Sequence, residues 1–167
     1  MEYPRRKNNR LIGFDYSSSG TYFITICTDN RECTLSTITD VGDGFPVPQL
    51  TGAGYIADRF INFINKKYPT VFVDNYVIMP NHIHLLLIVG ENGTGNPSPT
   101  IGNVVGWLKY VITKQINHNN DMPRHKIFQR SYHDHIVRNE ASYRKICDYI
   151  TNNPLNWETD CFYESNI

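Results

Sequence analysis

The segment from Met79 to Leu87 constrains the fold more than any other part of this chain, because it places two histidines at the start of a strongly apolar run. Side chains of a β-strand alternate between its two faces, so His82 and His84 would project from the same side. Ile83 would point the other way, into a core with Leu85. Two imidazoles on a buried strand can hold one metal ion, so the segment predicts a sheet with a candidate metal site on one face.

The flanking sequence predicts an α+β domain. Four segments rich in β-branched and aromatic residues are candidate strands: residues 22–28, 71–79, 82–89 and a stretch within 127–137. Three segments with apolar residues at helical spacing are candidate helices: residues 55–67, 101–116 and 141–152. The order β-α-β-β-α-β, followed by one more helix, is that of the ferredoxin-like antiparallel sheet with helices packed on it.

We expect all 167 residues to form a single domain, because the chain is long enough for one core and too short for two. Residues 1–20 are predicted to be a basic N-terminal arm. Residues 34–54 are rich in glycine and proline and are predicted to be an irregular loop, and residues 90–100 a flexible one.

Cysteine usage and hydropathy favour a cytoplasmic protein. The four cysteines show no CxxC spacing and are too sparse for a disulfide scaffold, so we interpret them as reduced thiols. The longest apolar stretch, residues 83–89, has the length of a buried strand, and the N-terminal residues lack the hydrophobic segment of a secretory signal. We therefore expect no membrane association.

The net charge is zero, with 16 basic and 16 acidic residues, which argues mildly against a nucleic-acid binder. The basic residues are nevertheless clustered, and either cluster could contact phosphate or could be a disordered tail or a solvated surface. The first cluster contains Arg5, Arg6, Lys7 and Arg10, and the second contains Arg124, His125, Lys126 and Arg130.

The third candidate helix offers two side chains that could complete a site around the histidines. Tyr149 lies on the flank of its apolar stripe, and Asn153 follows about one turn later on nearly the same side. Pro154 disfavours helical geometry for the residue before it, so Asn153 is expected at the helix end. A purely structural helix C-cap remains an alternative for Asn153.

Taken together, these motifs resemble the HUH single-tyrosine transposases, and more narrowly the REP-associated tyrosine transposases that act on repetitive extragenic palindromes in bacteria. The resemblance rests on Met79-Pro80-Asn81-His82-Ile83-His84 and on Asp148-Tyr149-Ile150-Thr151-Asn152-Asn153-Pro154 in the last helix. The segment 128–139 before that helix is also similar, and the resemblance covers about residues 20–157.

The resemblance implies a metal-dependent endonuclease and strand transferase acting on single-stranded DNA with hairpin or palindromic elements, as a monomer or a homodimer. His82 and His84 would bind Mg²⁺ or Mn²⁺, with Asn153 as the third ligand. Tyr149 would attack the scissile phosphate to give a 5′-phosphotyrosine and a free 3′-hydroxyl. Tyrosine is a weak nucleophile at neutral pH, and a cation that polarises the phosphate supplies much of what is missing.

Several alternatives remain at this stage. His133 and His135 repeat the His-x-His pattern, but Asp134 between them indicates a solvated strand, so we expect the metal at the first pair. His135 fits the family-like segment and could lie near the DNA. The chain could also be a catalytically silent DNA-hairpin-binding module of the same fold, or a metallo-phosphodiesterase with a water nucleophile.

Overall fold

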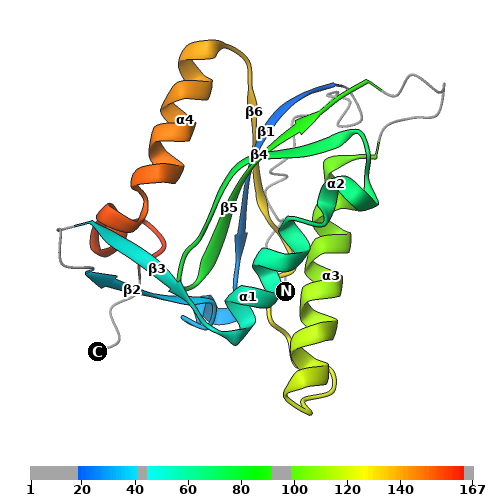
Figure 1. Ribbon diagram of the computed structural model, residues 1–167, viewed down its shortest axis with the longest axis vertical. Coiled ribbons are helices and arrows are strands. Elements are labelled where there is room, and N and C mark those ends of the chain that lie inside the picture. Colours follow the sequence, from blue (N-terminus) through cyan, green and yellow to red (C-terminus); the bar gives the residue numbers. More distant parts are fainter. Residues whose placement is uncertain (1–18, 41–44, 92–98, 164–167) are drawn as a thin grey trace, which may run out of the picture.

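The computed structural model describes residues 19–40, 45–91 and 99–163. Its centre is a sheet of four strands in the order β4-β5-β1-β6, in which every neighbouring pair is antiparallel. These strands are β1 (Gly20–Cys27), β4 (Val71–Ile78), β5 (His82–Val89) and β6 (His133–Val137). Helices cover both faces of the sheet (Figure 1). An α+β fold with an antiparallel sheet was predicted, and the order of elements around the sheet is the expected one.

One face of the sheet packs against α1 (Gly52–Ile61), α2 (Ile64–Lys67) and α3 (Ile101–Asn119). The core on this face contains Ile83 and Leu85 of β5 together with the buried stripe of α3, including Leu108. Because strand side chains alternate, the odd-numbered residues of β5 enter this core. The imidazoles of His82 and His84 therefore project from the opposite face, which carries α4 (Glu140–Asn152).

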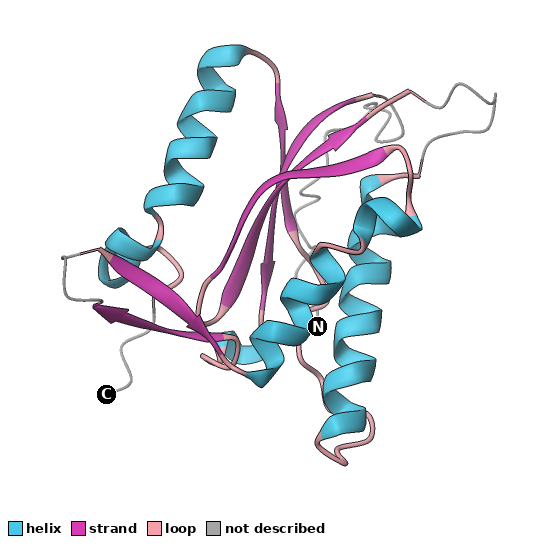
Figure 2. Ribbon diagram, viewed as in Figure 1, coloured by secondary structure: helices cyan, strands magenta, loops and turns pink. Residues whose placement is uncertain are grey.

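The predicted irregular loop over residues 34–54 is wrong. This stretch forms a hairpin of β2 (Ser36–Asp40) and β3 (Pro46–Leu50), and α1 begins at Gly52, earlier than the predicted residue 55. Figure 2 shows this hairpin apart from the central sheet. The prolines fit because β3 has a single partner strand, so the missing N–H groups need not interrupt a second ladder. The predicted helix 55–67 is two helices, α1 and α2, with a break between them.

The helix α4 is largely exposed, although its sequence carries an apolar stripe. Asn139 caps it, with its Oδ1 accepting a hydrogen bond from the Ser142 N–H at 2.8 Å. Only Ile150 of this helix is buried, and the exposed hydroxyl of Tyr143 donates a hydrogen bond to Asp74 of β4 at 2.7 Å. After α4 the chain continues directly into a 3₁₀ helix, η2 (Pro154–Thr159).

The predicted N-terminal arm and most of the predicted loop 90–100 cannot be compared with the structure. Residues 1–18 and 92–98 lie outside the described part of the chain. The four cysteines are free, as predicted. Within residues 19–40, 45–91 and 99–163, no helix has the length and apolar character needed to cross a membrane. A second short 3₁₀ helix, η1 (Asp29–Arg31), follows β1.

Candidate metal and tyrosine site

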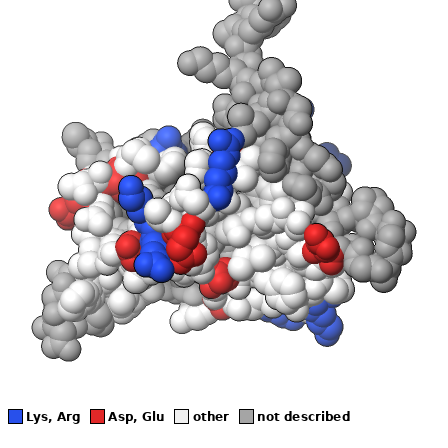
Figure 3. All heavy atoms as spheres, turned by 90° about the horizontal axis from the view of Figure 1, so that it is seen from above, with Lys and Arg blue, Asp and Glu red and all other residues white. Residues whose placement is uncertain are grey.

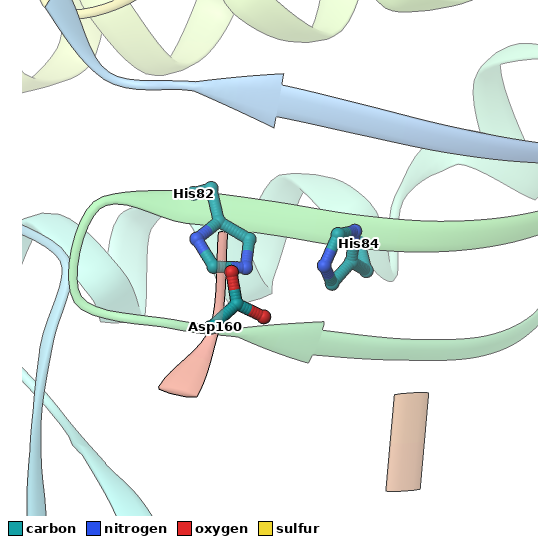
Figure 4. A group of neighbouring side chains, drawn as sticks. All are labelled: His82, His84 and Asp160. Atoms are coloured by element: carbon teal, nitrogen blue, oxygen red, sulfur yellow. The ribbon is translucent and has the colours of Figure 1, made fainter. Parts of the chain in front are cut away.

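The two histidines of β5 lie side by side at the start of the strand. The backbone N–H of Met79 donates to the His82 carbonyl at 2.9 Å, which closes the turn through Pro80 and Asn81 and starts β5 at His82. Both imidazoles are buried, and their ring centroids are 4.5 Å apart. Figure 4 shows them projecting from one strand.

Hydrogen bonds at Nδ1 orient both imidazoles. Nδ1 of His82 lies 2.8 Å from Oδ1 of Asn81, whose Nδ2 donates to the Phe162 carbonyl at 2.8 Å. The Asn81 oxygen is therefore the acceptor, and His82 carries its proton on Nδ1. Nδ1 of His84 lies 2.8 Å from the Thr25 hydroxyl, which can accept in the same way. Both Nε2 atoms are then left unprotonated with a free lone pair, the form in which imidazole binds a metal.

Burial favours the neutral form of both imidazoles. Desolvation lowers the pKa of His82 to about 4, although the negative charge of Asp160 opposes the shift. The pKa of His84 is also lowered well below its usual value, by burial first and then by His82. Neither Nε2 atom has a hydrogen-bond partner among the described residues. The histidines thus present two neutral, unsatisfied nitrogen acceptors.

The C-terminal end of α4 brings the predicted tyrosine and asparagine to these histidines. The ring of Tyr149 is centred 5.1 Å from the ring of His84 and 6.0 Å from that of Phe23, and the residue is 40% exposed. Asn153 is only 1% exposed. Its Nδ2 donates to a carboxylate oxygen of Asp160 at 2.8 Å, while its Oδ1 has no partner in the described structure.

Asp160, which follows η2, is the residue of this site that sequence reasoning missed. Its Oδ2 also accepts a hydrogen bond from the Tyr149 hydroxyl at 3.2 Å. One ligand atom each from His82, His84 and Asp160 lie within 4.8 Å of one another, and Figure 4 shows the carboxylate pointing toward the imidazole of His82. Burial, followed by the charge of Asp160, raises the pKa of Tyr149, so its hydroxyl stays protonated at neutral pH.

The unsatisfied atoms at this site fit a divalent cation. Three of the five buried side-chain polar atoms without a partner in the described structure are His82 Nε2, His84 Nε2 and Asn153 Oδ1. Leaving buried acceptors unpaired costs free energy, and a cation shared between them would offset that cost. Imidazole nitrogen together with an amide oxygen is a donor set of the kind that holds divalent metals, and the carboxylate of Asp160 lies close to the imidazoles.

The predicted DNA-contacting residues do not all lie on the face that carries the histidines. Lys126 and Arg130 are exposed beside α3, where they line a surface hollow on the opposite side of the sheet, and Lys126 pairs with Asp29. Arg124 is exposed in the same connection, between α3 and β6. The predicted contacts Arg5, Arg6, Lys7 and Arg10 lie outside the described residues.

His135 does lie on the face of the sheet that carries the histidine pair. It is opposite Phe23 in the β1–β6 register, and His133 is opposite Thr25, which is in turn opposite His84. Directly paired residues of an antiparallel sheet share a face, so β6 presents His133 and His135 beside the site. Both are exposed.

Comparison with known proteins shows the family to which this chain is related. Residues 54–153 match the family model described as "Transposase IS200 like". An uncharacterized protein of Haemophilus influenzae is 34% identical over 174 residues, covering 95% of this chain and 93% of the relative. A second Haemophilus influenzae protein, named "Putative REP-associated tyrosine transposase", is 28% identical and covers 84% of this chain and 73% of the relative.

A solved structure has a similar fold. It is the structure of a REP-associated tyrosine transposase bound to a REP hairpin, and it aligns with a TM-score of 0.55 and 22% sequence identity. The alignment covers 94% of this chain and 74% of that one. At this level of identity the similarity shows a common fold.

Proposed function

The chain belongs to the IS200-like transposase family, and we propose on that basis that it is a metal-dependent endonuclease and strand transferase for single-stranded DNA, with Tyr149 as its nucleophile. One observation carries the proposal. Three buried acceptor atoms, on His82, His84 and Asn153, have no partner among the described residues, and the ring of Tyr149 is centred 5.1 Å from that of His84. β5 and the end of α4 are about 65 residues apart in the sequence, so the fold itself assembles this group.

His82, His84 and Asn153 would hold Mg²⁺ or Mn²⁺ through Nε2, Nε2 and Oδ1. Such a cation, when bound, polarises the scissile phosphate and neutralises charge on its oxygens. Asn81 and Thr25 keep the two imidazoles in the ligating tautomer by accepting their Nδ1 protons. Two imidazoles and one amide leave coordination positions free for phosphate oxygens and water.

In the proposed reaction, the hydroxyl oxygen of Tyr149 attacks the phosphorus atom and releases its proton. A bond forms between this oxygen and phosphorus, and the bond between phosphorus and the 3′ oxygen breaks. The products are a 5′-phosphotyrosine on the enzyme and a DNA strand whose 3′ oxygen has gained a proton. Joining is the reverse attack by a 3′-hydroxyl, which releases Tyr149. The 40% exposure of Tyr149 gives a strand access to it.

The proposed substrate is single-stranded DNA with a hairpin or palindromic element, because a protein of similar fold was solved with a REP hairpin. Basic and acidic side chains are interspersed on the face shown in Figure 3, in keeping with the zero net charge of the chain. Because the described residues form no large basic surface on this face (Figure 3), we assign the phosphate contacts to individual basic residues. These are His135 beside the site, Arg124, Lys126 and Arg130 beside α3, and Arg5, Arg6, Lys7 and Arg10 near the N-terminus.

The test is incubation of the protein with a labelled single strand that carries a palindromic element, in the presence of Mn²⁺ or Mg²⁺. The expected product is a covalent protein–DNA band that survives denaturation and is absent with a chelator. Tyr149→Phe should abolish the band, whereas Tyr110→Phe, at an exposed tyrosine of α3 on the other side of the sheet, should leave it unchanged. Abundant adduct with Tyr149→Phe would remove Tyr149 from the role of nucleophile.

A second candidate function is a DNA-hairpin-binding module without turnover. The burial of both imidazoles favours it, since the ring of Phe162 is centred 4.8 Å from that of His82 and 6.0 Å from that of His84. A closed site of this kind would suit a protein that binds hairpins and does not cleave them. Hairpin binding with no cleavage in any divalent cation would select this candidate over the nuclease.

A further inference from the structure

The carboxylate of Asp160 contacts both side chains that the C-terminal end of α4 contributes to the site, Tyr149 and Asn153. Oδ2 of Asp160 accepts hydrogen bonds from Nδ2 of Asn153 at 2.8 Å and from the hydroxyl of Tyr149 at 3.2 Å. Asp160 lies eleven residues beyond Tyr149, after the 3₁₀ helix η2, so the chain turns back on itself to make these contacts. The same oxygen thus contacts both side chains.

The bond to Asn153 determines which end of its amide faces the histidines. A side-chain amide has a donor end and an acceptor end, and rotation by half a turn exchanges them. A carboxylate can only accept, so Asp160 selects the NH₂ end of Asn153. The Oδ1 atom is then directed away from Asp160, where it is buried and without a partner in the described structure. The amide is held in the orientation that a metal ligand needs.

Asp160 is itself fixed by the segment around it. Its Oδ1 accepts the backbone N–H of Phe162 at 2.7 Å. The Phe162 carbonyl in turn accepts from Nδ2 of Asn81, whose Oδ1 receives the Nδ1 proton of His82. These bonds form a connected path from Asn153 through Asp160 and Asn81 to His82. Both ends of this path are ligands in the proposed function.

We propose that Asp160 is a positioning residue, which holds the Asn153 oxygen toward the metal position and the Tyr149 hydroxyl beside it without being a metal ligand. This inference rests on the proposed function, because it concerns the same site. Three of the roughly four acceptor positions of the carboxylate are taken by hydrogen bonds, two on Oδ2 and one on Oδ1. Each of the three atoms assigned as ligands, by contrast, lacks a partner among the described residues.

The test is a double-mutant cycle on the affinity of the full chain for Mn²⁺, measured by isothermal titration without DNA. Asp160→Ala and Asn153→Ala should each weaken binding, by about 10- to 100-fold for a partner that orients a ligand. Because Asp160 acts through Asn153, the double variant should bind no more weakly than Asn153→Ala alone. If the two losses multiply instead, Asp160 does not act through Asn153, and the positioning role is wrong.

Three further measurements test whether a loss of affinity has another cause, such as a change of charge or a failure to fold. Glu158→Gln removes one negative charge from an exposed residue two positions away, so its Mn²⁺ affinity should equal that of the wild type. Asp160→Glu, which keeps a carboxylate acceptor, should recover part of the affinity lost in Asp160→Ala. Thermal unfolding of each variant identifies one that fails to fold, and in that case Asp160→Asn replaces Asp160→Ala in the cycle.

Different experimental results would contradict the positioning role of Asp160 and the proposed nuclease function. If the wild-type chain binds Mn²⁺ and all Asp160 variants bind it equally well, the positioning role is overturned while the metal site stands. If the cycle behaves as expected but no protein–DNA adduct forms, the positioning role stands and the nuclease assignment is overturned. Faster adduct formation by Asp160→Asn at saturating Mn²⁺ would show that the carboxylate restrains Tyr149, and would also contradict the positioning role.

Discussion

Asn81 accepts the Nδ1 proton of His82, the next residue in the chain, at 2.8 Å. Both residues are buried, and Asn81 also reaches the C-terminal segment through the Phe162 carbonyl. A neighbour in sequence thus sets the tautomer of one proposed ligand and attaches the segment that carries Asp160. The pair explains why the turn before β5 contains an amide side chain at this position.

Replacement of Asn81 should therefore weaken the metal site. In Asn81→Ala the imidazole of His82 loses its orienting acceptor, and we expect Mn²⁺ affinity to fall by about 10- to 100-fold. Isothermal titration of the purified chain measures this. Asn62→Ala, at an amide near the end of α1, is the matched control and should leave the affinity unchanged. Wild-type affinity in Asn81→Ala would show that the tautomer of His82 does not depend on Asn81.

The metal-free protein should lose stability as the pH falls below about 6.5, the ordinary pKa of a solvated histidine. Burial lowers the pKa of His82 from 6.5 to about 4 in the folded chain, so the unfolded chain binds more protons between these values. The free energy of unfolding therefore falls as the pH decreases through this window. A shift of this size corresponds to about 3 kcal/mol from His82 alone.

Urea unfolding at several pH values between about 7.5 and 4.5, with a chelator present, measures the effect. His82→Gln removes the titrating group, so its stability should depend less on pH than that of the wild type. His118→Gln, at an exposed histidine of α3, should keep the wild-type dependence. Identical pH profiles for the wild type and His82→Gln would mean that His82 is not held neutral by burial.

The attachment of α4 to the sheet should depend on Ile150. It is the only buried residue of that helix, and it is adjacent to Tyr149. Ile150→Ala should lower the free energy of unfolding by about 2 kcal/mol or more, because it leaves a cavity under the helix. Ile146→Ala, at a half-buried position one turn earlier, should cost less. Equal losses in urea unfolding would show that the two positions contribute alike to the docking of α4.

Binding of single-stranded DNA should weaken as salt rises. If four to six basic residues contact phosphates, the slope of log affinity against log salt should be about −3 to −4. Deletion of residues 1–10, which removes Arg5, Arg6, Lys7 and Arg10, should flatten the slope and weaken all sequences alike. Fluorescence anisotropy at several salt concentrations measures it. An unchanged slope after the deletion would assign the contacts to Arg124, Lys126, Arg130 and His135.

The sequence was sufficient to predict the central sheet and to select His82, His84, Tyr149 and Asn153 as candidate site residues. His82 and His84 could be placed on one face because strand side chains alternate, and Tyr149 and Asn153 on one side of a helix because residues four apart lie close together. These are local periodicities, which depend little on the rest of the fold. Their meeting could be expected only from the resemblance, since no local pattern says which helix covers which face.

Other features depended on tertiary structure. Asp160 lies in no periodic or recognised motif, and its role arises from the path of the chain after η2. The β2–β3 hairpin was missed because its prolines and the nearby glycines are typical of loops, whereas a two-stranded sheet tolerates prolines on an unpaired edge. The apolar spacing in residues 141–152 predicted the helix α4 itself, but not that it would pack mainly near Ile150 and leave its flanks in solvent.

The most direct test of the account is mass spectrometry of the protein after reaction with a hairpin-bearing single strand in Mn²⁺. The DNA is trimmed with nuclease and the protein is digested, so that any covalent nucleotide remains on one peptide. The account predicts a nucleotide joined through its 5′-phosphate to the peptide that contains Tyr149. Cleaved DNA with a free 5′-phosphate and no modified peptide would instead show a water nucleophile, and would contradict the central claim.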